Sequence, residues 1–333
     1  MPWDLVTLNS GYHMPSIAYG TWTLGNGQGP INQIAQAFDT GYYHIDTAQG
    51  YRNEAEVGVA LHESGFSRGE VFITTKYSGS NGLDIPTSIR NSVNNMNTSY
   101  VDLYLIHNPR LAVPDIPTVW AQMEKVVEDG LAKSIGVSNF GVQDMEILLA
   151  SAKIKPAANQ ILLHPYVYMQ QAPIVDYAAE HGIVIEAYSA LQPITNDPSG
   201  PLDAPLNDIA NRLGASTDQV LLAWTKAKGA VVVTTSSKKM RLEGYQYAGD
   251  LGKSYVKGNW PHVTLHVCIS ELSKEDIAAI DAAGASGEKR ITVRKGLRKF
   301  GIGTLVGVVV LVLCSYFGIK IDRFLLDLLC RNR

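Results

Sequence analysis

Residues 71–107 read VFITTKYSGSNGLDIPTSIRNSVNNMNTSYVDLYLIH. The two apolar, β-branched runs in this stretch, Val71–Tyr77 and Val101–His107, predict buried strands. The stretch between them, Ile85–Met96, has the apolar spacing of an amphipathic helix. The segment therefore predicts two strands joined by a helix, the unit from which parallel sheets are built.

The same alternation runs along most of the chain. Strands are predicted at Ser16–Trp22, His44–Ala48, Val71–Tyr77, Val101–His107, Ser134–Asn139, Ala158–His164, Ile183–Ser189 and Val231–Ser236. Helices are predicted at Ile31–Thr40, Glu54–Ser64, Ile85–Met96, Pro117–Asp129, Val142–Ser151, Gln171–His181 and Thr217–Lys228. Eight strands with intervening helices over roughly 285 residues predict an α/β fold, a (β/α)₈ TIM barrel over residues 1–285. The alternative is an open doubly wound sheet, which usually has a G-x-G-x-x-G turn after its first strand, and none occurs there.

The composition excludes several other classes of protein. The chain has 333 residues, 46% hydrophobic and 18% charged, with a net charge of −3. This balance is too apolar for a disordered chain and gives no general attraction to nucleic acid, so no nucleic-acid partner is expected. Its three cysteines, Cys268, Cys314 and Cys330, all lie near the end of the chain, which does not fit a disulfide scaffold. A reducing compartment is consistent with this distribution.

A hydrophobic stretch near the end of the chain predicts a membrane anchor. Residues 300–319, FGIGTLVGVVVLVLCSYFGI, carry no charge. As a helix they would be about 30 Å long, enough to cross a bilayer, whereas a buried core helix would usually be shorter and amphipathic. Residues 286–299 are expected to form a basic linker and residues 320–333 a short amphipathic tail. We therefore expect a single-pass, tail-anchored protein bound to a lipid bilayer through residues 300–319.

The charges beside this stretch predict its orientation. Six basic residues precede it within residues 286–299, and four follow it, at Lys320, Arg323, Arg331 and Arg333. The positive-inside rule then places the larger domain in the cytosol. The N-terminal sequence MPWDLVTLNSG lacks the basic and apolar regions of a secretory signal.

One segment interrupts the alternation. Residues 250–269, DLGKSYVKGNWPHVTLHVCI, match neither a strand nor a helix of the repeating pattern. They are either a loop at the substrate face or an error in the gene model. A capped helix is then predicted at Glu271–Ala283, where Ser273 precedes Glu275 and Asp276.

Four polar side chains follow consecutive predicted strands. Asp46, Lys76 and His107 stand at strand ends, and Tyr51 lies in the loop after the first of them. In a (β/α)₈ barrel these ends meet at the catalytic mouth. An ammonium next to a phenol lowers the phenol pKa, and a carboxylate holds the ammonium in place, so the set is suited to donating a proton. No serine or cysteine nucleophile beside a base, and no metal-ligand cluster, is expected at this mouth, so we predict no metal.

At these positions the sequence resembles the aldo-keto reductases. The matching motifs are GYYHIDTAQGYRNEAEVG (Gly41–Gly58), VFITTK (Val71–Lys76), LYLIH (Leu103–His107), IGVSNF (Ile135–Phe140), NQILLHPY (Asn159–Tyr166) and EAYSAL (Glu186–Leu191). The resemblance, from about Leu8 to Ala283, implies a barrel enzyme that reduces aldehydes or ketones with a nicotinamide cofactor. It implies that Tyr51 is the general acid, that Lys76 and Asp46 tune it, and that His107 orients the carbonyl.

The resemblance also implies how the cofactor is held. Ser138, Asn139 and Gln160 would bind the carboxamide, Tyr188 with the adjacent Ser189 would flank the nicotinamide ring, and Asp46 would reach its ribose. Gly20, Thr21 and Trp22 would border cofactor and substrate. Thr235 replaces the usual lysine of the phosphate motif, but Ser236 and Arg241 remain, and Lys238 or Lys239 can supply the missing charge. NADPH is the expected cofactor, with NADH still possible.

The substrate side departs from the family pattern. Asn108 stands where relatives often have tryptophan, so the pocket formed by Trp22, Tyr51, His107 and Asn108 is expected to be more polar. Either Gln28–Pro30 with residues 250–269 covers the mouth, or the mouth stays open. The alternative to an enzyme is a cofactor-binding regulatory or scaffolding membrane subunit with little turnover, as in some channel-associated relatives. The complete set of four polar residues favours the enzyme.

Overall fold

The computed structural model describes residues 3–251 and 272–287. The chain divides into one compact unit, Met1–Ala285, and a second, Ser286–Arg333, almost all of which lies outside the described residues. The predicted membrane stretch at 300–319, nearly all of the linker, the tail, and the segment at 252–271 are therefore also outside the described residues. Within the described part, no helix is both long and apolar enough to cross a bilayer.

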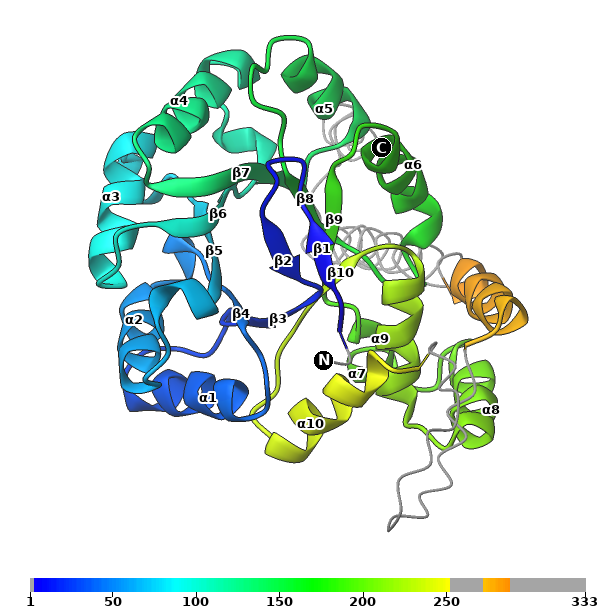
Figure 1. The fold of residues 1–333 in the computed structure, drawn as a ribbon. Coiled ribbons are helices and arrows are strands. Elements are labelled where there is room, and N and C mark those ends of the chain that lie inside the picture. The colour runs from blue at the N-terminus through cyan, green and yellow to red at the C-terminus, as the bar shows by residue number, and fades with distance from the viewer. Residues whose placement is uncertain (1–2, 252–271, 288–333) are drawn as a thin grey trace, which may run out of the picture. The chain divides into compact units, whose positions relative to one another are not determined.

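Eight parallel strands close into a barrel in the order β10-β3-β4-β5-β6-β7-β8-β9. Their bounds are β3 Ile17–Gly20, β4 His44–Asp46, β5 Phe72–Tyr77, β6 Val101–Ile106, β7 Ala132–Ser138, β8 Ala158–Leu162, β9 Val184–Tyr188 and β10 Val231–Thr234. The barrel closes where Val232 of β10 pairs with Ile17 of β3 (Figure 1). All eight predicted strands and the (β/α)₈ barrel are confirmed.

Helices surround the strands in the expected alternation. They are α1 Gln28–Asp39, α2 Glu54–Glu63, α3 Ile85–Asn95, α4 Ile116–Glu128, α5 Val142–Leu149, α6 Tyr168–Glu180, α7 Gln192–Thr195, α8 Asp203–Leu213, α9 Thr217–Ala227 and α10 Lys239–Ala248. Two of them, α3 and α4, begin with the same kind of N-cap. Asp84 and Asp115 accept hydrogen bonds from the N–H groups of Thr87 and Thr118, both at 2.8 Å, and a proline stands in the first turn of each helix.

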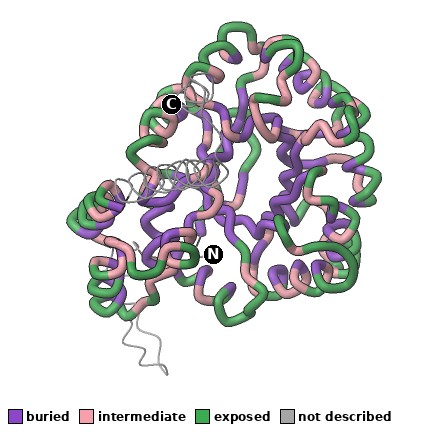
Figure 2. Tube along the Cα trace, turned by 180° about the vertical axis from the view of Figure 1, so that it is seen from behind, coloured by how far each residue is buried: buried purple, intermediate pink, exposed green. Residues whose placement is uncertain are grey.

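The apolar spacing of each helix determines which face it buries. In α3, Ile85, Ile89 and Val93 are buried at i, i+4 spacing and face the strands, whereas the other face of the helix is exposed. Figure 2 shows the same division around the whole ring, with buried residues on the strands and the inner sides of the helices. The core therefore lies between strands and helices and keeps the strands, and the residues at their ends, in fixed positions.

Several elements were not predicted. A hairpin of β1, Leu5–Thr7, and β2, His13–Pro15, lies at the amino ends of the barrel strands, where Leu8 and Met14 pack among barrel residues such as Leu103. The sequence prediction also lacked α7, α8 and α10. The stretch before and within α8 contains three prolines and resembles a loop, but Pro205 lies in the first turn of the helix, where its missing N–H costs no intrahelical bond.

The predicted helix near the end of the domain is present. Residues 274–287 are helical. Ser273 and Asp276 exchange hydrogen bonds at its start: the Ser273 N–H donates to the Asp276 carboxylate at 2.8 Å, and the Asp276 N–H donates to the Ser273 hydroxyl at 3.2 Å. This capping box fixes where the helix begins.

Candidate active site

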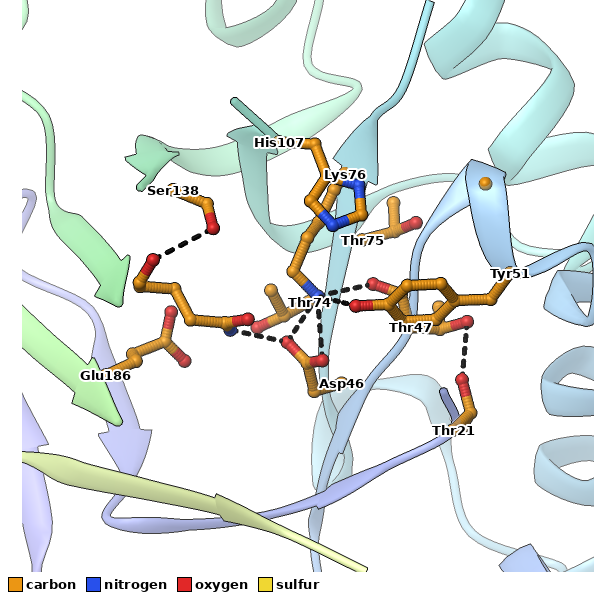
Figure 3. Close-up of polar contacts among 12 residues, drawn as sticks. Thr21, Asp46, Thr47, Tyr51, Thr74, Thr75, Lys76, His107, Ser138 and Glu186 are labelled. Atoms are coloured by element: carbon orange, nitrogen blue, oxygen red, sulfur yellow. Dashed lines mark hydrogen bonds and ion pairs between the residues drawn. The ribbon is translucent and has the colours of Figure 1, made fainter. Parts of the chain in front are cut away.

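The four predicted catalytic side chains meet at one end of the barrel (Figure 3). Asp46 is the last residue of β4, Lys76 is in β5, and His107 directly follows β6. Tyr51 ends the short 3₁₀ helix η1, Gln49–Tyr51, after β4. Because parallel strands present their carboxyl ends on the same side, residues distant in sequence converge here.

A buried ion pair joins Lys76 to Asp46. The Lys76 Nζ donates to both carboxylate oxygens, at 2.7 and 2.8 Å, and to the carbonyl of Thr47 at 2.9 Å. Its contact with the Tyr51 hydroxyl is longer, 3.4 Å. The Lys76 side chain is 0% exposed and that of Asp46 is 3% exposed. Burial disfavours the ammonium, but Asp46, Tyr51 and Glu186 together outweigh this effect, and the pKa of Lys76 is raised above its ordinary value.

Tyr51 differs from the sequence prediction. We expected the neighbouring ammonium to lower the pKa of the phenol. Instead, burial raises the pKa of Tyr51, and the opposing effect of Lys76 only partly compensates. Tyr51 therefore stays protonated at neutral pH and has a proton to donate.

The His107 ring lies edge-on to Tyr51, with 5.6 Å between ring centroids and 76° between ring planes. Burial, together with the positive charge of Lys76, lowers the pKa of His107 to about 4. The imidazole is therefore neutral at pH 7, with one nitrogen as donor and the other as acceptor. The sequence prediction that no serine lies beside a base was wrong, because the Ser78 hydroxyl is 3.0 Å from Nδ1 of His107.

The predicted carboxamide-binding residues form a connected row. The Tyr188 hydroxyl donates to the Asn139 side-chain carbonyl at 2.9 Å, and the Asn139 amide donates to the Ser138 hydroxyl at 3.0 Å. Ser138 in turn donates to the backbone carbonyl of Gln160 at 2.9 Å. The Gln160 side chain donates to Asp46 at 2.7 Å, so the row is joined to the catalytic cluster.

Two residues of this rim have an unusual backbone. Asn139 and Ser189 follow β7 and β9 with φ of 63° and 60°. Non-glycine residues rarely adopt positive φ, and such strain gathers at functional sites. Tyr188 and Ser189 are both half-buried at the same end of the barrel.

The three residues predicted at the end of β3 have different surroundings. Trp22 is 63% exposed and free to form a wall of the mouth. Thr21 is fully buried, and its hydroxyl lies 2.9 Å from that of Thr47 and 3.1 Å from the Asn53 side-chain carbonyl. Its side chain supports the loop instead of bordering a ligand. Gly20 packs closely against β10, since a Cβ there would lie 3.3 Å from the Val233 side chain.

The basic residues predicted for a phosphate lie where β10 leads into α10. Lys238 precedes the helix, and Lys239 and Arg241 are in its first turn, all three exposed. The Ser236 hydroxyl accepts the backbone N–H of Lys238 at 3.1 Å. The positive end of a helix dipole next to exposed cations favours an anion.

The structure shows the local surroundings of two residue sets predicted for the substrate side. The Asn108 side-chain carbonyl accepts the N–H of Arg110 at 3.0 Å and so caps a short turn, η4 Pro109–Leu111, which commits that oxygen to the backbone. Gln28–Pro30 form the first turn of α1, so a role for them in covering the mouth stays a prediction. The segment at 252–271 lies outside the described residues.

Two further residues at this site were missed. Glu186 is fully buried in β9, and its carboxyl oxygens lack a hydrogen-bond partner of normal geometry within the described residues. Burial and the Asp46 charge raise the pKa of Glu186 to about 8. A signal for both residues exists, because side chains two apart on a strand share a face. Ser78 follows Lys76 by two residues, and Glu186 precedes Tyr188 by two.

Among the described residues no group of three His, Cys, Asp or Glu could hold a metal ion.

Fold and site together define a (β/α)₈ barrel with a proton-donating cluster at its carboxyl mouth. Residues 16–251 match the model of the aldo/keto reductase family. The chain is 37% identical over 239 residues to the NAD/NADP-dependent indole-3-acetaldehyde reductase of Schizosaccharomyces pombe, covering 69% of this chain and 84% of that protein. It is 36% identical over 243 residues to glyoxal reductase of Bacillus subtilis, covering 72% and 84%. The chain belongs to the aldo/keto reductase family.

Solved structures agree with this assignment. A crystal structure of an aldo/keto reductase from Brucella melitensis matches with a TM-score of 0.70 and 32% identity, covering 84% of this chain and 99% of that one. An aldo-keto reductase complexed with NADPH matches with a TM-score of 0.72 and 28% identity, covering 84% and 88%.

Proposed function

We propose that this protein reduces aldehydes or ketones to alcohols, with NADPH as the reductant. The observation that carries the proposal is the cluster at the barrel mouth, in which a protonated Tyr51 lies between the Lys76–Asp46 pair and a neutral His107. The relatives named above are reductases of aldehydes, which supports the same reaction class.

The residues at the mouth fit a nicotinamide cofactor. The connected hydroxyl and amide groups of Ser138, Asn139 and Gln160 offer both donors and acceptors, as a carboxamide requires. Tyr188 and Ser189 complete the row and would flank the ring, and Trp22 and Gly20 would border it. Asp46 accepts three hydrogen bonds from Lys76 and Gln160, which leaves its carboxylate able to accept one more from a ribose hydroxyl.

The other end of the cofactor fits the start of α10. We assign Ser236, Lys238 and Arg241 to a 2′-phosphate, because exposed cations stand at the start of a helix there. A phosphate at this position distinguishes NADPH from NADH, and NADH remains a possible second cofactor because Thr235 contributes no charge.

The chain's own groups then account for the proton. When bound, the reduced nicotinamide supplies the hydride to the carbonyl carbon. Tyr51 donates its phenolic proton to the carbonyl oxygen, and the Lys76 ammonium stabilises the resulting phenolate. Asp46 keeps Lys76 charged in a buried site, and His107 orients the carbonyl oxygen by a hydrogen bond. Trp22 and Asn108 line the remaining pocket.

The test is oxidation of NADPH by the full chain with a panel of aldehydes, followed by absorbance. We expect turnover in the parent chain and near-complete loss in Tyr51→Phe, with cofactor affinity unchanged. Tight binding of NADPH without turnover of any aldehyde would instead favour the regulatory or scaffolding subunit.

The domain organisation beyond the barrel is proposed from sequence alone. We assign 1–285 to the barrel, 286–299 to a basic linker, 300–319 to a membrane span and 320–333 to a tail, with the barrel in the cytosol. Alkaline carbonate extraction of membranes tests the span, and release of the chain into the supernatant would contradict it.

Glycosylation at Asn97, in the exposed sequon Asn97-Thr98-Ser99, would contradict the cytosolic orientation.

A further inference from the structure

Ser78 lies between the two groups that face the substrate oxygen. Its hydroxyl oxygen is 3.0 Å from the backbone nitrogen of Gly50 and 3.0 Å from Nδ1 of His107. Gly50 directly precedes Tyr51 in η1. One hydroxyl therefore connects the turn that carries Tyr51 to the imidazole ring of His107.

The directions of these hydrogen bonds follow from the available protons. The Gly50 N–H can only donate, so the Ser78 oxygen accepts there. The Ser78 hydroxyl has one proton, for which two acceptors are near, Nδ1 of His107 at 3.0 Å and the carbonyl of Lys76 at 3.5 Å. The shorter contact to His107 is the better hydrogen bond.

We propose that Ser78 is a positioning residue whose hydroxyl donates to Nδ1 of His107 and holds the imidazole in the tautomer protonated on Nε2. This inference rests on the proposed function, in which His107 donates a hydrogen bond to a carbonyl oxygen. In the opposite tautomer, Nε2 would present a lone pair to that oxygen and repel it.

The close packing around Ser78 makes the connection specific. A Cβ added at Gly50 would lie 3.0 Å from the Ser78 oxygen and 3.2 Å from its Cβ, so the turn approaches the strand as closely as a glycine allows. The side-chain carbonyl of Gln49 also accepts the Ser78 N–H at 3.3 Å. Without the Ser78 hydroxyl, the contact from the Ser78 N–H to Gln49 would still join the strand to the turn, whereas Nδ1 of His107 would lose its donor.

The experiment reads the tautomer directly. The full chain, labelled with ¹⁵N-histidine, is studied by NMR at neutral pH, and the His107 signals are assigned by their loss in His107→Gln. We expect Nε2 to carry the proton in the parent chain and in Ser78→Thr, which keeps the hydroxyl. In Ser78→Ala we expect a mixture of both tautomers. Ser80→Ala is the matched control, since the Ser80 side chain makes no hydrogen bond to another described residue.

Kinetics provide a second readout. In Ser78→Ala, kcat for aldehyde reduction should fall about tenfold, the value of one lost hydrogen bond, while the Kd for NADPH stays unchanged. Ser78→Thr should recover most of this loss.

Several outcomes would overturn the inference. A proton on Nδ1 in the parent chain contradicts it whatever the variants do, and so does an unchanged tautomer in a folded Ser78→Ala chain. Labelling of Ser78 by a fluorophosphonate would show a nucleophile instead of a positioning residue. The NMR result does not depend on turnover. A parent chain with the expected tautomer but no reductase activity would therefore count against the proposed function alone.

Discussion

The two ends of the barrel carry the same three kinds of side chain in different surroundings. At the carboxyl end, Asp46 pairs with Lys76 beside Tyr51. At the amino end, Asp102 pairs with Lys133 at 3.0 Å, and the Lys133 ammonium lies 3.1 Å from the Tyr100 hydroxyl. A carboxylate, an ammonium and a phenol are thus in contact at both ends of the barrel.

Burial and neighbours separate the two clusters. Lys76 is 0% exposed, whereas the side chain of Lys133 is 31% exposed. Asp102 has a second cation, Arg68, at 2.6 Å and also accepts the backbone N–H of Ile73 at 3.0 Å. The negative charge of Asp102 is therefore well neutralised, and the amino-end cluster is partly exposed to water. Its ion pairs join β6 to β7 and to Arg68.

The comparison shows that residue types alone do not define this active site. Only the carboxyl-end cluster lies beside a neutral imidazole and is joined to the polar row of β7, β8 and β9 through Gln160. Low exposure strengthens its electrostatic interactions, so a change of protonation there has larger consequences.

The largest difference is expected for the two phenols. Tyr51→Phe removes the proton donor and should lower kcat about a thousandfold, within the usual range for general acid catalysis. Tyr100→Phe should leave kcat close to the parent value. Steady-state NADPH oxidation measures both variants, and equal losses would contradict the assignment of the site to one end.

The two lysines should differ in stability as well as activity. Lys76→Met leaves Asp46 buried and uncompensated, so we expect a loss of about 3 kcal/mol in the free energy of unfolding and at least a hundredfold lower kcat. Lys133→Met leaves Asp102 paired with Arg68 and should cost about 1 kcal/mol or less. Urea unfolding, with each variant checked by circular dichroism, measures this difference, and comparable losses would contradict it.

A smaller effect is expected at the proposed phosphate site. Arg241→Ala removes one charge-assisted contact and should raise the Kd for NADPH about tenfold without changing that for NADH. Lys133→Ala at the amino end is the control and should alter neither constant. Fluorescence titration measures the Kd for both cofactors. An equal increase in the Kd for NADH would contradict the assignment of Arg241 to the phosphate site.

The last difference concerns pH and the buried Glu186. Its folded pKa of about 8 exceeds the ordinary value near 4.5, so the folded protein retains a proton that the unfolded chain has lost. Stability from this group is complete below about pH 4.5 and is lost as pH rises towards 8.

Glu186→Gln cannot ionise and should escape this loss. Relative to the parent, the variant should become more stable between pH 5 and pH 9, as measured by urea unfolding at several pH values. A stability difference that does not change with pH would show that Glu186 is already ionised in the folded protein. Asp102→Asn at the amino end serves as the comparison, because it removes a carboxylate that has two cationic partners.

The sequence predicted correctly the features that depend on neighbouring residues, and it failed for features that depend on distant segments. Alternating strands and helices were predictable because apolar spacing and caps such as Asp84 act within a few residues. Helix α8 was missed because the prolines near it resemble a loop. The pKa of Tyr51 was predicted in the wrong direction, because burial depends on segments far away in sequence and outweighs the charge of Lys76.

The sequence by itself determined the barrel and the four polar residues at its carboxyl mouth, since periodicity and strand ends are local properties of the chain. The tertiary structure alone decided which of those residues are buried, which are neutral, and which neighbours they have. Ser78 and His107 are 29 residues apart and contact each other at 3.0 Å only because β5 and β6 are adjacent in the closed barrel. Burial and proximity, which control proton affinity, arise only when distant segments pack together.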